Sequence, residues 1–426
     1  PYLTILSPNK TILGNAELQG HWTIPATGEE GERRFQAWLA KEVPSPGVTR
    51  TTGRKGVAPV AIDQYRRDDG KSGGGKPLAL CLGDDPSATL ISLCTHQPRR
   101  AILFYDGYTP LIVEKARQIR KWARRLPVET IDFVPTDHLG RGIRRWLSRE
   151  NEEIRVDITP GTKAQSVALM TARCGEVWHL RNDLGAAKAL LGTGRKPLAA
   201  PDLITQAWIM GEEIIEEGSD SANLAEVDQD MLGLLARFLD DWIKQLPKKE
   251  WNLRALRSMQ LGPNRVEIEE GKISVYYNGE MKRGILPQTE GGYWFECLVE
   301  NAFRQAGVEE MRRSLKIGWP WDRKQHPSKK FRAEIDLFGR IAHRFLIVSC
   351  KVGKTKGAYV REIEAVARIF GRFTIPILTQ PKVNPKTVQE SVAARGGVVR
   401  LGIREIAEPA RFREILQKVF KARRLG

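Results

Sequence analysis

The sequence predicts an α/β protein with a Rossmann-like, parallel-sheet domain in its middle and a second α/β domain with a mixed sheet in its last third. Apolar runs alternate with amphipathic stretches between residues 76 and 197, and a strand hairpin, helices and further strands follow from about residue 262. Gly/Pro-rich breaks at 69–77 and 192–197 flank the middle region. At 426 residues the chain is too long for a single hydrophobic core, so two or three domains are expected.

The middle domain alternates predicted strands with predicted helices of a length that favours right-handed βαβ units and a parallel sheet. Strands are expected over residues 78–82, 101–105, 129–134, 154–158 and 177–181. Helices are expected over residues 87–95, 110–125, 140–149 and 163–172.

The last third contains two predicted strands with acidic and basic residues near their ends. Residues 331–354 read FRAEIDLFGRIAHRFLIVSCKVGK, which predicts two strands around a short turn. Side chains alternate between the faces of a strand, so Glu334 and Asp336 share one face, and Ser349 and Lys351 share a face of the next strand. Strand pairing can therefore bring a carboxylate and a lysine together at one edge of the sheet.

A carboxylate beside a lysine suits metal-dependent phosphodiester hydrolysis. Carboxylate oxygens bind Mg²⁺ or Mn²⁺, and the bound cation lowers the pKa of water and stabilises charge on the phosphate. The lysine orients or helps to deprotonate the water and offsets the phosphate charge. An ordinary solvated Asp and Lys at strand ends is the alternative interpretation.

This arrangement resembles the PD-(D/E)xK nucleases, whose pattern is an acid, a hydrophobic strand and then acid-x-Lys. The family often adds a Glu from the preceding helix, and Glu296 in YWFE matches it. The resemblance implies a metal-dependent endodeoxyribonuclease with Glu296, Asp336 and Lys351 as catalytic residues. It also implies metal ligands at Glu296, Asp336 and Cys350, the last through its carbonyl.

One position departs from the family pattern. Ser349 stands two residues before the lysine, where the family has Glu or Asp, and serine is a poor metal ligand. Glu362 or Glu364 on the next helix is a candidate for a displaced acid. A nucleic-acid-binding regulatory protein with an inactive nuclease fold therefore stays open as an alternative.

Basic residues surround this constellation. The formal net charge of +17 favours polyanionic partners, with nucleic acid as the first candidate. Lysines in the flanking loops are expected to contact phosphate without reading sequence. These candidate nucleic-acid-binding residues are Lys324, Lys329, Lys330, Lys354 and Lys356.

Polar, turn-rich loops follow the predicted strands of the middle domain, including GDDPS at 83–87 and TPGTK at 159–163. In a parallel sheet, ligands bind at the carboxyl ends of the strands. The second loop opens a helix, so its backbone N–H groups, two hydroxyls and a lysine can bind a phosphate. A plain N-capped helix start explains the same residues equally well.

The segment DITPGTKAQS at 157–166 is similar to the signature of CARF domains, the Rossmann-like sensors of cyclic oligoadenylate in type III CRISPR systems. A CARF domain followed by a PD-(D/E)xK domain resembles the CRISPR ancillary nucleases that cyclic tetra-adenylate activates. The resemblance implies that this activator lies between two CARF domains, the second belonging to the same full-length chain or to a homodimer partner. The positions that match the family's ligand-binding loops are Gly83, Asp84, Ser87, Thr159, Gly161, Thr162, Lys163 and Gln165.

The resemblance also implies an activity: nicking of supercoiled duplex DNA in antiviral defence, once cyclic tetra-adenylate has bound. A homodimer that cuts both DNA and RNA, and a constitutive restriction-type nuclease, are alternatives. No run approaches the ~18 apolar residues of a membrane span, so no membrane partner is expected. The five cysteines form no CxxC pair and fall singly, mostly in apolar stretches, which indicates reduced core residues and a cytoplasmic location.

An internal repeat suggests a further domain. Residues 12–43 and 273–303 both contain a hairpin, a hydrophobe-Pro-x-Thr segment and an amphipathic helix. We interpret residues 1–75 as a partial, degenerate nuclease-like domain and linker, which implies the two-CARF monomeric type with its first CARF domain ahead of residue 1. The remaining boundaries are a CARF domain over 76–197, a helical connector over 198–261 and the nuclease domain over 262–426.

Overall fold

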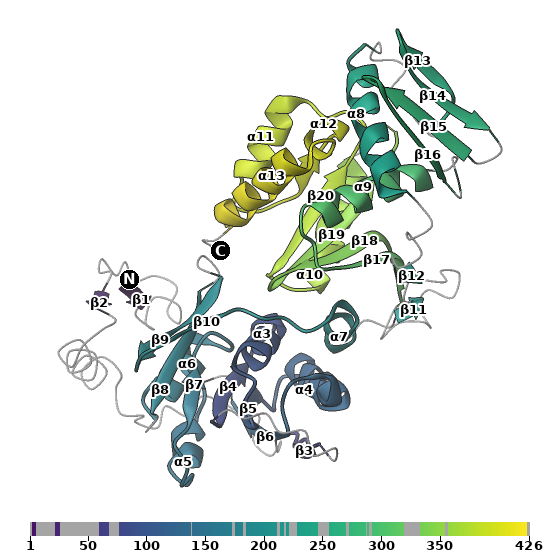
Figure 1. Cartoon of the computed structure of the whole chain (residues 1–426). Coiled ribbons are helices and arrows are strands. Elements are labelled where there is room, and N and C mark those ends of the chain that lie inside the picture. The colour runs from purple at the N-terminus through teal and green to yellow at the C-terminus, as the bar shows by residue number, and fades with distance from the viewer. Residues whose placement is uncertain are drawn as a thin grey trace.

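The computed structural model describes two α/β domains, which we call the middle domain (residues 59–201) and the C-terminal domain (residues 214–423), joined by helix α7 (Figure 1). The described residues are 2–5, 22–25, 59–67, 76–137, 139–172, 175–181, 185–210, 214–216, 219–220, 228–245, 255–269, 272–286, 288, 292–318, 333–353 and 357–423; of 2–5, 22–25, 214–216 and 219–220 only the backbone is described. All five lysines of the predicted nucleic-acid-binding loops lie outside these residues, as does most of the predicted degenerate domain.

The middle domain has the predicted parallel sheet, with antiparallel strands added at both edges. The sheet order is β10-β9-β8-β7-β4-β5-β6-β3, and the five strands from β8 to β6 are parallel. The parallel strands are β4 (Leu78–Leu82), β5 (Arg100–Asp106), β6 (Thr130–Thr136), β7 (Arg155–Asp157) and β8 (Glu176–Arg181). The edge strands are β3 (Tyr65–Arg66), β9 (Ala186–Leu191) and β10 (Arg195–Pro197).

Helices cover both faces of this sheet, which explains why β4 is apolar throughout. Leu80 of β4 packs in one cluster with Leu90 and Ile119, whereas Cys81 packs in another with Ile143. The helices are α3 (Ser87–His96), α4 (Pro110–Trp122), α5 (Ile143–Leu147) and α6 (Lys163–Met170), and a 3₁₀ turn, η1 (Ala123–Arg125), ends α4. The four predicted helices are all confirmed, α5 as a shorter helix than expected.

The order of the sheet reverses at β4, which pairs with β5 on one side and β7 on the other. The loops that follow β4 and β7 therefore diverge onto opposite faces at this switch point, where open α/β sheets bind their ligands. These contain the two segments, 83–87 and 159–163, that the sequence singles out.

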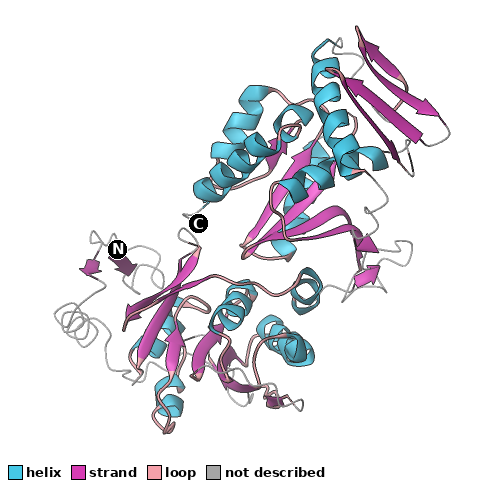
Figure 2. Cartoon of the chain, viewed as in Figure 1, coloured by secondary structure: helices cyan, strands magenta, loops and turns pink. Residues whose placement is uncertain are grey.

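The C-terminal domain contains the predicted mixed sheet, in the order β11-β17-β18-β19-β20-β21 with β12 also on β17 (Figure 2). The β17–β18–β19 pairs are antiparallel and the β19–β20–β21 pairs are parallel. The strands are β11 (Ile214–Glu216), β12 (Ser219–Asp220), β17 (Glu310–Ile317), β18 (Ala333–Ile341), β19 (Arg344–Cys350), β20 (Thr374–Thr379) and β21 (Val399–Leu401). Its helices are α8 (Gln229–Gln245), α9 (Tyr293–Gln305), α10 (Gly357–Ile369), α11 (Pro385–Ala393), α12 (Ile403–Ile406) and α13 (Pro409–Ala422).

A separate four-stranded meander, β13-β14-β15-β16, packs beside α8. Its strands are β13 (Met259–Leu261), β14 (Asn264–Glu269), β15 (Lys272–Tyr277) and β16 (Glu280–Ile285). It includes the hairpin of the second repeat copy. In the first copy, residues 12–43, the structure describes only β2 (Trp22–Pro25), which pairs with β1 (Tyr2–Ile5) ahead of the copy.

The region expected as a helical connector contains strands as well as helices. After α7 (Leu203–Ile209), β11 and β12 extend the edge of the C-terminal sheet, and α8 buries Leu235 and Phe238 in that domain's core. The Gly/Pro-rich break at 192–197 holds the turn of the β9–β10 hairpin, with Gly192 at φ +92° and Gly194 at φ +147°. Glycine supplies the left-handed backbone of that turn, so its presence there does not indicate a linker.

The two domains contact each other directly around α7 and β20. Phe373, in the turn before β20, lies in a cluster with Ala88, Ile91 and Trp178 of the middle domain. The Trp208 ring of α7 stacks on Trp122 of α4, with centroids 4.1 Å apart. Side chains that belong to one domain therefore complete the core of the other.

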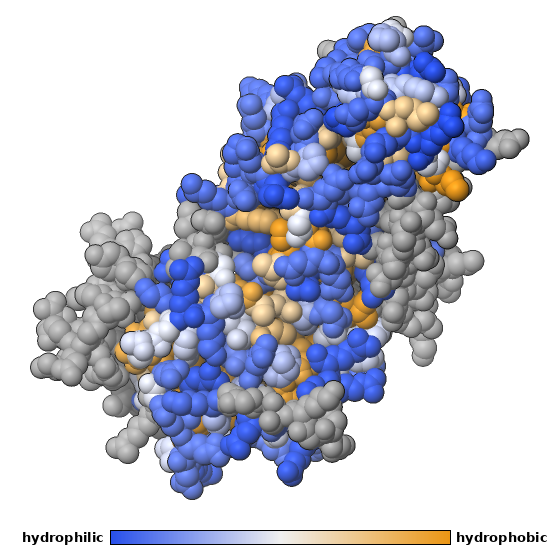
Figure 3. Space-filling model, viewed as in Figure 1, coloured by the Kyte–Doolittle hydropathy of each residue, from blue (hydrophilic) through white to orange (hydrophobic). Residues whose placement is uncertain are grey.

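The face in view is mostly hydrophilic (Figure 3). Among the described residues the exposed large hydrophobic side chains are Val60, Tyr108, Leu111, Met281 and Ile285, which belong to several different elements. None of the described helices is both long and apolar enough to cross a membrane.

Candidate functional site

Strand pairing brings Asp336 and Lys351 together, as the alternation of side chains predicts. Leu337 pairs with Val348, which sets Asp336 opposite Ser349 at the open end of the strand pair. Asp336 Oδ2 accepts hydrogen bonds from Lys351 Nζ at 3.0 Å, Ser349 Oγ at 3.2 Å and the Cys350 N–H at 2.6 Å. One carboxylate oxygen is thus the common acceptor of three donors.

Lys351 is half-buried and keeps its positive charge. Burial lowers the pKa of Lys351, but the charge of Asp336 and its hydrogen bond outweigh burial and leave the pKa raised. The ammonium group therefore holds its proton at neutral pH and acts as a cation toward phosphate. Of the three roles expected for this lysine, offsetting charge and orienting water fit the raised pKa better than taking a proton from water does.

Glu296 faces this pair from the first turn of α9. Burial, with repulsion from Asp336 as the second cause, raises the pKa of Glu296 to about 8. The positive charges of Arg313 and Lys351 act in the opposite direction. Because repulsion between charges falls with distance, this effect of Asp336 on the pKa of Glu296 indicates that the two carboxyl groups are neighbours, and the three predicted catalytic residues lie in one region.

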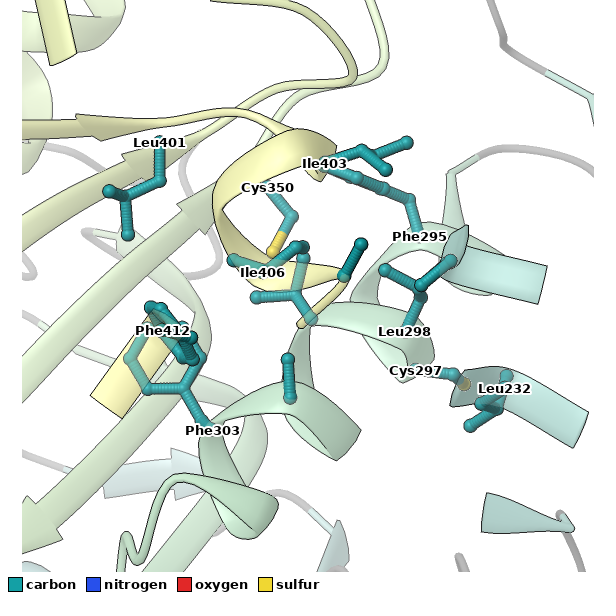
Figure 4. Close-up of a cluster of buried hydrophobic side chains, with 14 of the residues drawn as sticks. Leu232, Phe295, Cys297, Leu298, Phe303, Cys350, Leu401, Ile403, Ile406 and Phe412 are labelled. Atoms are coloured by element: carbon teal, nitrogen blue, oxygen red, sulfur yellow. The ribbon is translucent and has the colours of Figure 1, made fainter. Parts of the chain in front are cut away.

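Hydrophobic packing holds α9 in place. The side chains of Phe295 and Leu298 lie beside that of Ile403, and Phe303 meets Phe412 edge to face with centroids 4.8 Å apart (Figure 4). Cys350 also directs its side chain into this cluster (Figure 4). Since neighbours on a strand alternate, Ser349 and Lys351 then face away from the cluster, toward Asp336.

A buried ion pair, which the sequence pattern did not reveal, locks α9 to β17. Glu300 lies one helical turn after Glu296, and Arg313 Nε donates to its Oε2 at 3.0 Å. Both side chains are almost fully buried, and Arg313 also donates to Cys297 Sγ at 3.2 Å. The only sequence signal was a charged residue on the apolar face of each element.

The donor set fits a hard divalent cation only in part. Glu296 and Asp336 offer carboxylate oxygens, and the burial and repulsion that raise the pKa of Glu296 are what a cation would relieve. Within the described ranges, no three His, Cys, Asp or Glu side chains gather closely enough to hold a metal by themselves. A bound ion would therefore need backbone carbonyl or water oxygens as well. The backbone of Cys350 lies at Asp336, which fits the predicted carbonyl ligand.

The two candidate displaced acids lie apart from each other on α10. Glu362 is exposed, and its negative charge raises the pKa of Lys351, although less than the charge of Asp336 does. Glu364 instead lines a cavity between the two domains. Glu362 is therefore the better placed of the two.

In the middle domain the two candidate ligand loops touch. A Cβ added at Gly83 would lie 3.3 Å from the Gly161 Cα, and one at Gly161 would lie 2.5 Å from the Cys81 Cβ. Gly161 also has φ +89°, which favours glycine. Both glycines are needed for this close approach.

The other predicted ligand positions divide into exposed and structural ones. Asp84, Thr162 and Lys163 are exposed, and Thr159 is half-buried with its Oγ1 accepting from the Leu180 N–H at 2.6 Å. Ser87 is buried and its N–H donates to Asp85, whereas the buried Gln165 forms a capping box with Thr162. Ser87, Thr162 and Gln165 therefore shape the loops, whereas the exposed side chains of Asp84 and Lys163 are not part of these hydrogen bonds.

Two aspartates beside these positions have roles that the sequence pattern did not reveal. Asp157 is fully buried, accepts from Ser92 Oγ at 2.6 Å and from the Thr159 N–H at 2.9 Å, and so fixes the start of the second loop. Asp85 Oδ2 accepts from the Arg372 N–H at 2.9 Å, a hydrogen bond between the two domains.

Comparison with known proteins identifies relatives by structure alone. No protein-family model matches this sequence, and no curated protein matches it. The structure is similar to Can2 from Sulfobacillus thermosulfidooxidans in complex with cyclic tetra-adenylate, with TM-score 0.54 and 15% identity over 81% of this chain and 99% of Can2. It is also similar to protein VC1899 from Vibrio cholerae, with TM-score 0.52 and 14% identity over 82% of this chain and 98% of that one. These similarities show a shared fold that spans both domains.

Proposed function

We propose that this chain is a metal-dependent endonuclease, activated by cyclic tetra-adenylate, that nicks supercoiled duplex DNA in type III CRISPR antiviral defence. The observation that carries the proposal is the convergence of Glu296 and Lys351 on Asp336. The fold shared with Can2, whose solved structure contains cyclic tetra-adenylate, supports the choice of activator. The second CARF domain that completes the ligand site comes from the full-length chain or from a homodimer partner.

The chain's own residues have distinct roles in this proposal. Glu296, Asp336 and the Cys350 carbonyl would hold a divalent cation, which when bound supplies water of lowered pKa and offsets phosphate charge. Lys351 holds its proton at Nζ and pairs with a phosphate oxygen at the cleavage site. Ser349 donates to Asp336 and keeps that carboxylate oriented.

Cleavage of supercoiled plasmid with Mn²⁺ tests the proposal. We expect nicking by the full chain with cyclic tetra-adenylate, little without it, and loss of nicking in Lys351→Ala, because that variant lacks the cation beside the phosphate. No nicking under any condition would favour the nucleic-acid-binding regulatory protein, to which Ser349 already points. Nicking that is indifferent to cyclic tetra-adenylate would favour a constitutive nuclease, and a parallel assay on RNA distinguishes the dual-specificity alternative.

The raised pKa of Glu296 leads to a second prediction, which concerns the pH dependence of metal binding. With a pKa of about 8, this carboxyl group holds a proton at pH 7 that a cation must displace. We therefore expect Mn²⁺ affinity to rise about tenfold per pH unit below pH 8 and to level off above it. Calorimetric titrations from pH 6 to pH 9 measure the slope. The Glu296→Gln variant should bind more weakly with no such slope; an equal slope in that variant would contradict the prediction.

A further inference from the structure

We infer that the C-terminal domain supplies part of the activator's binding site, through Arg368, Arg372 and Arg395, which bind the phosphates of cyclic tetra-adenylate in the cavity between the two domains. This inference rests on the proposed function and extends the ligand site beyond the loops of the middle domain.

The cavity has about 940 Å³ and walls from both domains. Asp84, Asp85 and Thr159 line it from the two loops at the switch point of the middle sheet. Residues 367–369, 371–376 and 395–397 line it from the C-terminal domain. Its volume lies at the upper end of the range of about 300–1,000 Å³ that small-molecule sites occupy, so it can hold a large ligand or much of one.

The walls carry excess positive charge. Seven lysine or arginine residues line the cavity against three aspartate or glutamate residues, so an anionic ligand is favoured. Arg368, Arg372 and Arg395 are exposed, and their side chains form no hydrogen bond or ion pair with another described residue. Guanidinium groups without a hydrogen-bond acceptor in the protein are available to phosphate, which they bind through two parallel hydrogen bonds.

The position of the cavity favours the activator over the DNA substrate. Strands β19 and β20 are parallel, and their first residues, Arg344 and Thr374, line the cavity. At their other ends, Cys350 donates its N–H to the catalytic carboxylate of Asp336, and Thr379 Oγ1 donates to the carbonyl of Ser349. A strand of this length spans roughly 20 Å, so the cavity and the cleavage site occupy opposite ends of the same strands.

Direct contacts between the domains form one rim of the cavity. Arg372 donates its backbone N–H to Asp85, and a Cβ added at Gly371 would lie 2.8 Å from Ser87 Oγ. A ligand that contacts both the loop at 83–87 and the arginines would change how the two domains pack against each other at this rim. Because β20 begins there and ends at the active site, that change reaches the catalytic residues along a continuous strand.

Binding of cyclic tetra-adenylate to the full chain, measured by isothermal titration calorimetry, tests the inference. Each charged hydrogen bond contributes about tenfold in affinity, so the Arg368→Ala/Arg395→Ala variant should bind roughly 100-fold more weakly than wild type. Arg404→Ala is the matched control, because Arg404 is an exposed arginine of α12 that does not line the cavity. It should bind within about twofold of wild type, and melting curves verify that both variants are folded.

The other outcomes separate the inference from the proposed function. Wild-type protein that does not bind cyclic tetra-adenylate would overturn both. Wild-type binding with equal affinity in the double variant would overturn the inference alone and leave the loops of the middle domain as the site. Unchanged activator binding with weaker plasmid binding in the double variant would also overturn it, and would assign the cavity to nucleic acid.

Discussion

Replacing Asp336 with asparagine is expected to reduce plasmid nicking by roughly 10³-fold or more. The side chain keeps its size but loses the charge that pairs with Lys351 and that would bind a divalent cation. Metal-assisted stabilisation of phosphate charge is worth several kcal/mol, and each 1.4 kcal/mol changes a rate about tenfold. Initial rates at saturating cyclic tetra-adenylate and Mn²⁺ measure the effect.

Ser349→Ala is the matched control for Asp336→Asn. It removes one neutral donor to the same carboxylate oxygen, a hydrogen bond worth about 1 kcal/mol, so nicking should fall less than about tenfold. Plasmid binding measured on both variants should stay near wild type, which separates a lost catalytic step from lost binding. Near-normal nicking by Asp336→Asn would contradict the assignment. An equally large loss in Ser349→Ala would make Ser349 a ligand in place of the usual acid.

The parts of the site that sequence predicts are the local ones. Asp336, Ser349 and Lys351 lie on two consecutive strands joined by a tight turn, so period-two alternation and the hairpin geometry bring them together. Glu296 is more distant in sequence but begins a strongly amphipathic helix, whose apolar face could only pack on the sheet. The five parallel strands of the middle domain were predictable for a similar reason, because their continuous apolar runs require cover on both faces.

The parts that sequence does not predict depend on distant segments. Asp85 and Arg372 are 287 positions apart, and no local pattern indicates that one would cap the other. Ser87 and Gln165 occupy positions typical of a ligand loop. Their side chains are nevertheless buried, because Gln165 caps the start of α6 and the turn at Gly371 packs against Ser87. The β9–β10 hairpin was hidden because glycine serves flexible linkers and left-handed turns alike.

The interdomain cavity is lined by residues that are distant from one another in the sequence. Arg368 and Arg372 precede β20, whereas Arg395 follows α11, so three arginines from two segments gather only after the C-terminal sheet has formed. Asp84 and Asp85 face them across the cavity. None of these three arginine side chains forms a hydrogen bond or ion pair with Asp84 or Asp85 among the described residues, so an anion in the cavity would meet guanidinium groups that are not held by the acidic loop.

Glu300→Met is expected to destabilise the C-terminal domain by about 3–5 kcal/mol, because it leaves the Arg313 guanidinium buried without its carboxylate. Among the described residues, Arg313 would keep the Cys297 sulfur at 3.2 Å and the face of Tyr293, which lies 4.9 Å from its guanidinium carbon. Urea denaturation followed by tryptophan fluorescence measures the change. Trp294 reports on this region because it is fully buried in α9, the helix that carries Glu300.

Two further variants make the interpretation specific to the pair. Glu414→Met makes the same substitution at an exposed position of α13, where a change within about 0.5 kcal/mol is expected. Glu300→Met/Arg313→Met removes both charges and should regain most of the lost stability, because two apolar side chains of similar length replace a buried pair. Equal tolerance at Glu300 and Glu414 would mean that α9 does not depend on the pair. Glu296 would then owe its position beside Asp336 to hydrophobic packing alone.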